Sequence, residues 1–343
     1  MTWETKITNV QPDNLQIAGY PLQDLVEKKS LLEVAYLIVK GELPDPVQLA
    51  RMEEIAKEAA AAPVENIARS DSDDISKTLA AYFLTDTGLV GYSDEIPEEK
   101  TAYALGRTAR YLAEVYGNAI YGDSFSEIIY SAFTSGQFNE SRVRLLEALI
   151  TACVDHGVTP PSAQATLIAA STRASYEVSV AHGVGVITDV HGGAGAKAAA
   201  FFDECLDLYS GDLEGLIRKY GQEKKRIAGL GHRVHRNDPR RDILWNLSDG
   251  SGVSGHHVEL SKQVSQVFKK VTDKDLPINV DGVIGAIVAD FGLDRTAAKA
   301  IFIFGRVAGL SAHYFEEINT QPRMRRINFS EAEYTGPSVR EVQ

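Results

Sequence analysis

The densest group of cationic side chains in the sequence lies at residues 229–241. Gly229 and Gly231 stand directly before His232, and four arginines and a second histidine follow within the segment. Glycine lets backbone N–H groups approach a ligand closely, and the forked guanidinium of arginine binds carboxylates and phosphates. We therefore interpret this segment as a candidate anion-binding site. The alternative is a solvated helix start, which requires neither the glycines nor the histidines.

Three further segments place a titratable side chain beside glycine at an expected helix boundary. They are Asp155-His156-Gly157, His191 followed by two glycines, and Asp281 followed by Gly282. Each has a structural alternative, because an aspartate at a helix start is commonly an N-cap and a histidine beside glycine is commonly a hydrogen-bonded structural residue. Their combination with the arginine-rich segment favours a functional site.

An aspartate and two histidines suit one type of reaction. The carboxylate can remove a weakly acidic proton next to a thioester carbonyl, and a neutral imidazole can donate a hydrogen bond to the enolate oxygen that forms. A second imidazole can polarise an electrophilic ketone, while arginines hold the carboxylates of a small dicarboxylic acid. Closure of a cleft between two lobes would exclude water from the short-lived enolate.

The sequence lacks the motifs of several other classes of catalytic site. There is no His-Glu-x-x-His motif, and the adjacent His256 and His257 cannot share a helix face, so we expect no metal site. There is also no Gly-x-Ser-x-Gly nucleophile turn and no phosphate-binding loop of the Walker type. A largely helical chain offers no Rossmann context for a dinucleotide.

The composition of the chain argues against some classes of binding partner. The chain has 343 residues, 44% of them hydrophobic and 24% charged, and its net charge is −12. A chain of this length is expected to form a large core with two lobes. The acidic balance argues against nucleic acid or an anionic membrane as the main partner. No stretch is apolar enough for a membrane span, since the closest, residues 300–312, contains Arg306.

The sequence also indicates a compartment. The only two cysteines, Cys153 and Cys205, cannot form a disulfide scaffold and lie in patterns typical of buried helix. The first residues lack a basic region followed by an apolar one, so we expect no signal peptide. The simplest interpretation is a cytoplasmic protein.

Hydrophobic periodicity predicts an almost entirely α-helical protein. Residues 3–20 alternate weakly and predict a short β-like arm, whereas helical spacing begins at Pro21 and continues to Gly41. The small-residue stretch 160–186 is predicted to be one long helix. The polar end of the chain, from Thr320 to Gln343, is expected to be irregular or to reach a neighbouring subunit.

Taken together, these motifs resemble the citrate synthase superfamily, which includes citryl-CoA lyase and the C-terminal module of ATP-citrate lyase. The resemblance extends over nearly the whole chain, in the family's order and near its spacing. It is carried by Asp155-His156-Gly157, Val190-His191-Gly192-Gly193-Ala194, Gly229-Leu230-Gly231-His232-Arg233-Val234, Asp238-Pro239-Arg240, Asn279-Val280-Asp281 and the stretch with Arg306 and His313.

The resemblance implies a role for each matching residue. Asp281 would deprotonate the methyl group of acetyl-CoA, His191 would hydrogen-bond the enolate, and His232 would polarise the oxaloacetate carbonyl. His156, Arg240 and Arg306 would hold the carboxylates of oxaloacetate. One arginine would come from the C-terminal segment of the partner subunit, with Arg325 the chosen candidate beside Arg323 and Arg326. Arg236, with Gly229 and Gly231, would contact coenzyme A.

The resemblance also implies an architecture. It predicts an all-α fold with a large helical domain, residues 1–194 and 296–343, which would carry the dimer contacts and the oxaloacetate site. A smaller inserted helical domain, residues 195–295, would carry the coenzyme A site and the catalytic aspartate. The expected assembly is a homodimer. Coenzyme A thioester would be a substrate, and no permanent cofactor or metal is expected.

Several departures from the synthase pattern bear on the direction of the reaction. Cys153 stands where synthases carry a histidine, Gly282 stands where they carry an aromatic residue, and the segment from His232 to Arg240 is one residue shorter. These features favour cleavage of citryl-CoA to acetyl-CoA and oxaloacetate. The alternatives are a citrate synthase or 2-methylcitrate synthase that releases free coenzyme A, and a non-catalytic protein that binds coenzyme A or a dicarboxylate.

Overall fold

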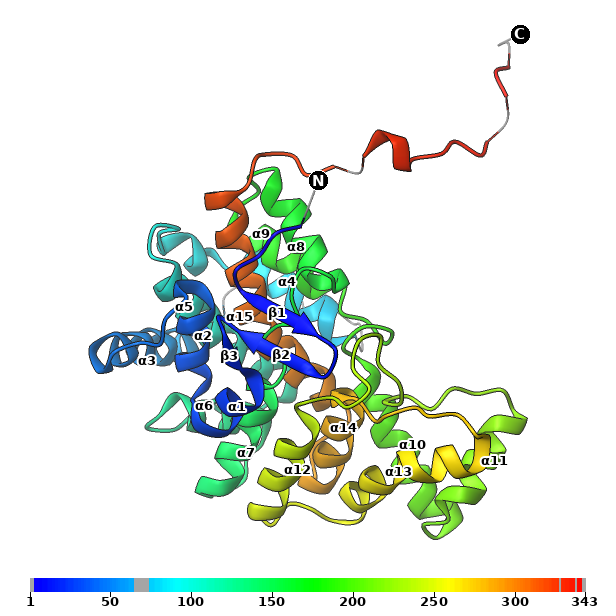
Figure 1. Cartoon of the computed structure of the whole chain (residues 1–343). Helices are drawn as coiled ribbons and strands as arrows, with labels where there is room; N and C mark the ends of the chain where they lie inside the picture. Colours follow the sequence, from blue (N-terminus) through cyan, green and yellow to red (C-terminus); the bar gives the residue numbers. More distant parts are fainter. Residues whose placement is uncertain (1–2, 65–73, 327, 337, 341–343) are drawn as a thin grey trace.

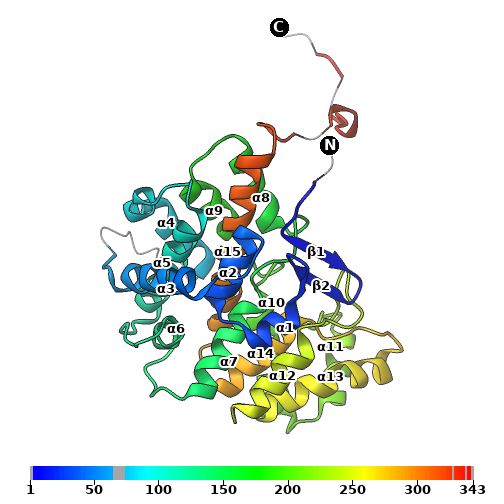
Figure 2. The same cartoon turned by 60° about the vertical axis from the view of Figure 1, so that its left-hand side comes forward.

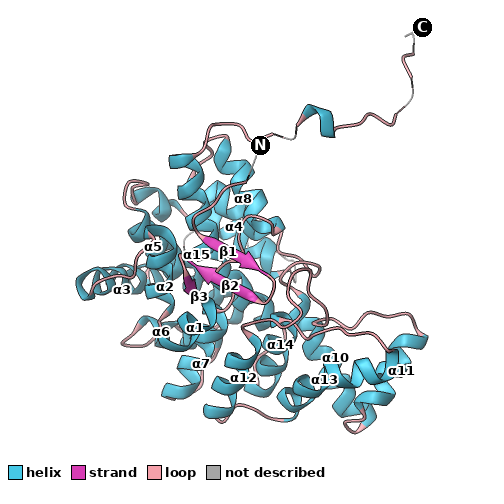
Figure 3. Cartoon of the chain, viewed as in Figure 1, coloured by secondary structure: helices cyan, strands magenta, loops and turns pink. Residues whose placement is uncertain are grey.

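The structure is a computed structural model that describes residues 3–64, 74–326, 328–336 and 338–340. The described residues form fifteen α-helices, one three-stranded sheet and two short 3-10 helices, Thr87–Gly91 and Phe329–Glu331. Figure 3 shows how little of the chain is strand. The prediction of an all-α protein is therefore confirmed.

The β-like arm predicted for residues 3–20 is an antiparallel sheet with the order β1 (Thr8–Gln11), β2 (Asn14–Ile17) and β3 (Tyr20–Pro21). Thr8 pairs with Ile17, and the tight turn between β1 and β2 contains Asp13 with a φ of 56°. Leu15 and Ile17 are buried beneath the sheet. Figure 1 shows the tip of this hairpin near the loops that join two groups of helices.

The first group of helices contains most of the chain before residue 190. Its members are α1 Leu22–Lys28, α2 Leu31–Lys40, α3 Pro46–Ala61, α4 Ile75–Thr85, α5 Pro97–Tyr116, α6 Phe125–Phe133, α7 Glu140–Thr151, α8 Pro161–Ser171 and α9 Tyr176–Gly185.

Two predicted helices are each divided in two, and local hydrogen bonds explain both breaks. The run from Pro21 to Gly41 is interrupted at Ser30, whose side chain accepts from Glu33 N while Glu33 accepts from Ser30 N in a capping box. The single helix expected for 160–186 is wrong, because the chain turns between α8 and α9. There Arg173 has a φ of 65°, and the Thr172 hydroxyl donates to the Ala169 carbonyl.

A second group follows, and the last long helix returns to the first group. The elements are α10 Ala194–Tyr209, α11 Leu213–Gln222, α12 Arg241–Gly250, α13 His256–Thr272, α14 Val280–Phe291 and α15 Thr296–Thr320. In Figure 1, α10 to α14 lie together below the rest of the molecule. Helix α10 packs on α14, and α13 packs on both α14 and α11. The division into domains at residues 195 and 295 stays a prediction.

Helix α15 is the centre of the core. Every residue from 297 to 315 is buried, which is the pattern of a helix surrounded by others. It contacts α2, α5, α7, α8 and α9 in one group and α10 and α14 in the other, and Figure 2 shows it running through the molecule. A Cβ on Gly305 would lie 2.1 Å from the Ile150 carbonyl oxygen. That close approach sets Arg306 beside residues 150–156.

The end of the chain leaves the helical body. Figures 1 and 2 show residues after α15 extending away from the helices, and Val339 is fully exposed. The irregular C-terminal stretch expected from the sequence is confirmed for the described residues, and whether it contacts a second subunit stays a prediction. Within the described residues, none of the helices has the length and apolar character that crossing a membrane requires.

One histidine joins three helices of the second group. His257 on α13 contacts Asp290 on α14 at 2.7 Å through Nδ1 and Asp203 on α10 at 2.8 Å through Nε2. Arg295 also pairs with Asp203 at 3.0 Å. The hydrogen bond to Asp290, and then that to Asp203, raise the pKa of His257 above its usual value of 6.5.

This cluster predicts a pH-dependent stability. Because the folded-state pKa of His257 is raised, its contribution is fully present below the unfolded pKa and is lost as pH rises through the folded pKa. We expect His257→Gln to lower the free energy of unfolding by about 1–2 kcal/mol near pH 6 and by much less near pH 9. Denaturant unfolding of both proteins at several pH values measures the difference. A difference that is constant over this range would contradict the assignment.

Candidate active site

Pairing between two segments brings the arginine-rich loop to the start of α14. Gly231 N donates to the Pro277 carbonyl at 2.7 Å, and Asn279 N donates to the Gly229 carbonyl at 2.9 Å. The Asn279 side chain also donates to the Gly231 carbonyl and caps α14 by accepting from Gly282 N. His232 and Asp281, which follow these two segments, are thereby held on neighbouring parts of the backbone.

The two glycines of the loop serve this pairing. Gly229 and Gly231 have φ values of 82° and 90°, which only glycine adopts easily. A Cβ on Gly229 would lie 2.5 Å from the Cα of Gly282, so the loop can approach the backbone of α14 this closely only with glycine at position 229. Since the Gly231 N–H is already bound to Pro277, the geometry does not support the predicted contact of this amide with coenzyme A.

Asp281 lies in the first turn of α14 and is half-buried. Burial raises the pKa of its carboxyl to about 6; the charges of Arg240 and Arg306 oppose the shift, and that of Asp238 adds to it. A carboxylate with this pKa is a stronger base than an ordinary aspartate and is still ionised at neutral pH. Those are the properties required of a general base for a weakly acidic carbon.

His232 is held as a neutral hydrogen-bond donor. Its Nδ1 accepts from the backbone N–H groups of Val234 at 3.0 Å and His235 at 2.9 Å. Burial lowers its pKa to about 4, so the ring is neutral at pH 7. With Nδ1 acting as acceptor, the single proton of the ring is on Nε2. His232 can thus donate from Nε2 to a carbonyl oxygen, as the predicted role requires.

His191 lies in the loop between α9 and α10. Its Nε2 is 2.9 Å from Ser162 Oγ and accepts from Ser162 N at 3.4 Å, and its ring meets Phe302 edge to face. Burial lowers its pKa to about 4, with Arg306 and Arg233 contributing. Because Nε2 accepts, the proton is on Nδ1. Ser162, at the start of α8, was not predicted as a site residue.

Three imidazoles gather beside this site. The Nε2 atoms of His156 and His235 are 3.2 Å apart, and the rings of His232 and His235 stack at a centroid distance of 4.5 Å. His235 is buried, and its Nδ1 accepts from Asp13 N at 3.0 Å. The sequence showed His235 only as part of the cationic segment, so its place beside His156 was not predicted.

The three histidines are close enough to be tested as a metal site. One ring nitrogen of each lies within 4.8 Å of the others. A neutral histidine ligates a metal through a nitrogen without hydrogen, and its other nitrogen then carries the proton. In His232 and His235 the Nδ1 atoms accept backbone N–H groups, so Nε2 carries the proton. Arg240 and Arg306 add positive charge, and the donor set does not fit a cation.

Arg306 is the strongest indication of an anionic ligand. Its side chain is 1% exposed, and its Nε donates to the Cys153 carbonyl at 3.1 Å. Its Nη1 atom is buried and has no hydrogen-bond partner among the described residues. A buried guanidinium with an unused donor is costly unless an anion occupies the position. Burial lowers the pKa of Arg306, and the charge of Asp155 opposes this shift.

Arg240 is buried as well, but it is already paired. Its Nε and Nη2 atoms donate to the two oxygens of Asp238 at 2.9 and 2.8 Å, and Nη1 donates to the Ala152 carbonyl at 3.2 Å. Asp238 Oδ2 also accepts from Val280 N at 3.1 Å. The pair ties the arginine-rich loop to both α7 and α14. Asp238, to which the resemblance assigned no role, holds Arg240 in place.

Behind His156, a buried network fixes the chain. Asp155 is fully buried, and its Oδ2 accepts from Thr8 Oγ1 at 2.6 Å and from Gly157 N at 2.7 Å. Its Oδ1 lies 3.1 Å from His313 Nε2. The interaction with His313, the charge of Arg306 and the hydrogen bond from Thr8 outweigh burial and hold the pKa of Asp155 well below its usual range. Asp155 therefore supports the loop of His156.

The predicted residues are brought together through two cations. The charge of Arg306 acts on Asp281, His191 and His156. The charge of Arg240 acts on Asp281, His156 and His232. Residues from positions 156, 191, 232, 240, 281 and 306 thus share one electrostatic environment at the meeting point of the two groups of helices.

Two predicted residues lie elsewhere in the chain. Arg236 is exposed on the loop. Arg325 is bound within its own chain, because its Nε lies 2.7 and 2.8 Å from the two oxygens of Glu317 and its guanidinium stacks on Trp3. Arg323 and Arg326 are exposed. Which arginine serves a second subunit stays a prediction.

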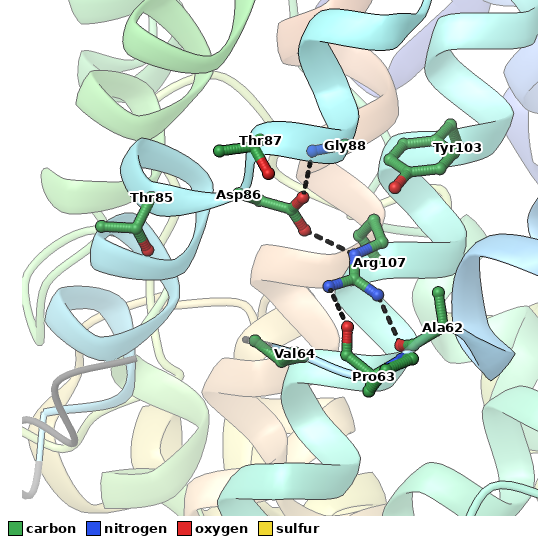
Figure 4. A pocket seen from close by; sticks show the side chains of 9 residues that line it. All are labelled: Ala62, Pro63, Val64, Thr85, Asp86, Thr87, Gly88, Tyr103 and Arg107. Atoms are coloured by element: carbon green, nitrogen blue, oxygen red, sulfur yellow. Dashed lines mark hydrogen bonds and ion pairs between the residues drawn. The ribbon is translucent and has the colours of Figure 1, made fainter. Parts of the chain in front are cut away.

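A separate cavity of about 260 Å³ lies between the C-terminal ends of α3 and α4 and the middle of α5. Figure 4 shows Arg107 at its centre, with its donors directed at Asp86 and at the carbonyls of Ala62 and Pro63. The guanidinium of Arg107 thus satisfies carbonyl groups at the end of α3, and its charge is paired with Asp86 and not left for a ligand. We therefore assign this cavity a structural role.

A family model described as citrate synthase, C-terminal domain, matches residues 1–327. The citrate synthase of Thermoplasma acidophilum is 25% identical over 98% of this chain and 93% of its own length. That of Corynebacterium glutamicum is 24% identical over 99% of this chain and 85% of its own length.

Two solved structures illustrate the structural likeness. Citryl-CoA lyase from Hydrogenobacter thermophilus is 27% identical, with a TM-score of 0.56, over 100% of this chain and 98% of that one. Citrate synthase from T. acidophilum, in a ternary complex with carboxymethyl coenzyme A and oxaloacetate, is 22% identical with a TM-score of 0.84, over 99% and 95%. The latter likeness shows the fold alone.

The glycine pairing of the loop predicts a graded response to substitution. Gly229→Ala combines an unfavourable φ with a contact of 2.5 Å to the backbone of Gly282, whereas a Cβ on Gly231 meets only Leu276 Cδ2 at 3.7 Å. We expect Gly231→Ala to lower the free energy of unfolding by about 1 kcal/mol and Gly229→Ala by about 3 kcal/mol or more. Thermal or denaturant unfolding of the matched pair measures this. Equal effects would show that the close contact with Gly282 is not significant.

Proposed function

Because the chain belongs to the citrate synthase family, we propose that this enzyme makes or breaks the carbon–carbon bond between acetyl-CoA and oxaloacetate. The observation that carries the proposal is the buried Arg306, with a free Nη1 donor, beside an aspartate of raised pKa and neutral histidines. A dicarboxylate would satisfy the arginine, and the aspartate and histidines are the groups that enolate chemistry needs. Coenzyme A would enter as part of a substrate, and the chemistry requires no bound cofactor.

In the condensation direction the roles follow from the protonation states. Ionised Asp281 takes a proton from the methyl group of acetyl-CoA, and His191 donates a hydrogen bond from Nδ1 to the enolate oxygen. The enolate carbon forms a bond to the carbonyl carbon of oxaloacetate. His232 donates a hydrogen bond from Nε2 to the carbonyl oxygen, which takes up a proton from water to become the hydroxyl of citryl-CoA, and Asp281 afterwards releases its proton to water. Arg306, with His156, holds the carboxylates of oxaloacetate.

Cleavage of citryl-CoA uses the same groups in reverse. The hydroxyl proton of citryl-CoA leaves to water while His232 donates a hydrogen bond from Nε2 to the oxygen that becomes the carbonyl of oxaloacetate. As the carbon–carbon bond breaks, protonated Asp281 returns a proton to the enolate carbon to give acetyl-CoA. The two directions differ in the fate of the thioester, because a synthase must hydrolyse citryl-CoA after condensation whereas a lyase must protect it from water.

We favour the lyase direction, on the departures from the synthase pattern. Gly282 is held against the backbone of Gly229, so no aromatic side chain can stand next to Asp281. Cys153 is fully buried, and burial raises the pKa of its thiol to about 12, so it cannot replace a titratable histidine. Citrate synthase is the second candidate, favoured by the names of the curated relatives.

A homodimer is proposed as the functional unit. The C-terminal residues extend from the body of the chain, and an arginine from this segment would complete the oxaloacetate site of the partner. Since Arg325 is neutralised by Glu317 in its own chain, the exposed Arg323 and Arg326 are the better candidates. Cytoplasmic localisation is proposed from the unpaired cysteines alone.

The proposed reaction is tested by supplying acetyl-CoA with oxaloacetate, and separately citryl-CoA, and following free coenzyme A, acetyl-CoA and oxaloacetate. The lyase direction predicts acetyl-CoA and oxaloacetate from citryl-CoA without free coenzyme A. Asp281→Asn, which keeps shape but removes the base, should lower turnover by about 10²–10⁴-fold. Release of free coenzyme A would establish the synthase, and inactivity with both substrates would refute the proposed function.

The two directions should depend on pH with opposite sign. Condensation requires ionised Asp281, so its kcat/KM should fall as pH drops below about 6. Cleavage requires protonated Asp281, so its kcat/KM should fall as pH rises above about 6. The histidines titrate near 4 and stay neutral over this range. Initial rates from about pH 5 to 9 give both profiles. If kcat/KM changed with pH in the same direction for condensation and for cleavage, Asp281 could not be the base of one and the acid of the other.

A further inference from the structure

We propose that His235 is a positioning residue that fixes the tautomer of His156, and that the turn of the N-terminal hairpin fixes His235. The inference rests on the proposed function, because His156 is assigned there to a carboxylate of oxaloacetate. It concerns Asp13 and His235, to which the family resemblance assigned no role. The observations are a chain of hydrogen bonds from Asp13 to His235 to His156.

The first step sets the tautomer of His235. A backbone N–H can only donate, so Nδ1 of His235 accepts from Asp13 N, at 3.0 Å. Burial lowers the pKa of His235, so its ring carries one proton. That proton must be on Nε2. His235 therefore presents an N–H group to whatever faces Nε2.

The second step transfers this restriction to His156. The atom facing His235 Nε2 is His156 Nε2, at 3.2 Å. Because His235 donates there, His156 Nε2 must accept, and the proton of His156 is on Nδ1. Burial, with Arg240, Arg306, His232 and His235 nearby, lowers the pKa of His156 to about 3, which keeps it neutral. His156 is thus a neutral donor from Nδ1, the form that binds a carboxylate.

The hairpin holds this arrangement with two further bonds. Asp13 Oδ1 accepts from the backbone N–H groups of Arg236 and Asn237, each at 2.7 Å. The left-handed φ of 56° at Asp13 lets its own N–H and its carboxylate reach neighbouring residues of one loop. Three hydrogen bonds therefore connect the β1–β2 turn to residues 235–237. The sheet at the start of the chain supports the loop that carries His232.

Two substitutions separate the two hydrogen bonds of His235. His235→Gln keeps an N–H donor at the distance of Nε2, while His235→Asn keeps an acceptor near Nδ1 and loses the donor to His156. We expect the Gln variant to keep the KM for oxaloacetate within about threefold. The Asn variant should raise it about tenfold or more, with little change in the KM for acetyl-CoA, since one hydrogen bond of about 1.4 kcal/mol corresponds to a factor of ten.

A spectroscopic measurement tests the tautomer without any substrate. In protein labelled with ¹⁵N-histidine, the nitrogen shifts identify which ring nitrogen carries hydrogen, and His156→Asn assigns the signals. We expect His156 protonated at Nδ1 in the wild type and in His235→Gln, and a mixture of tautomers in His235→Asn. His182, which is exposed and bonded to the Val178 carbonyl of its own helix, provides the control His182→Asn, which should change neither readout.

The outcomes distinguish this inference from the proposed function. Wild-type His156 protonated at Nε2 would overturn the inference even if the enzyme is active, and so would identical His156 signals in the Gln and Asn variants. If neither acetyl-CoA with oxaloacetate nor citryl-CoA is turned over, the proposed function fails while the tautomer result still decides the structural part. An Asn variant that fails to fold leaves the wild-type and Gln spectra to decide.

Discussion

The site depends on one buried arginine that no carboxylate of the described residues hydrogen-bonds. Arg306 lies in the middle of α15, is 1% exposed, and has an unpaired Nη1 donor. Its charge helps to keep His191 and His156 neutral and opposes the rise in the pKa of Asp281. A buried guanidinium donor without a partner is unfavourable, so a dicarboxylate that entered the site would relieve this cost and would itself be held strongly. The charge of Arg306 thus contributes both to substrate binding and to the protonation states that enolate chemistry needs.

Close backbone packing makes this arrangement possible. Gly305 lets α15 approach the carbonyl of Ile150, and Gly229 lets the arginine-rich loop approach Gly282. The first contact brings Arg306 to the loop of His156, and the second brings His232 to the start of α14, where Asp281 lies. The buried pair of Asp238 and Arg240 then fixes the loop to α7 and α14. Helices from both groups therefore contribute to one site, although the domain boundary between them is not tested by this packing.

Sequence patterns predicted the helical class, the β-like arm and the helical character of residues 21–41 and 160–186, because hydrophobic periodicity reports which face of a segment is buried. They did not predict the breaks at Ser30 and Arg173, which depend on hydrogen bonds between side chains and nearby backbone. The resemblance supplied Asp281, His191 and His232. It could not show that Arg240 is committed to Asp238, nor that Asp13 and His235 meet across 222 positions. Tertiary contacts of this kind leave no periodic signal, and Ser162 was missed for the same reason.

The central claim is that Asp281 acts as the base that makes the methyl carbon of acetyl-CoA nucleophilic. It is tested most directly by exchange of the methyl hydrogens of acetyl-CoA with deuterated water, in the presence of a dicarboxylate that cannot condense. This measurement does not depend on the direction of net turnover. The account predicts deuterium incorporation by the wild-type enzyme and at least a hundredfold slower incorporation, on the order of the loss of a general base, by Asp281→Asn. Equal incorporation by both proteins would contradict it.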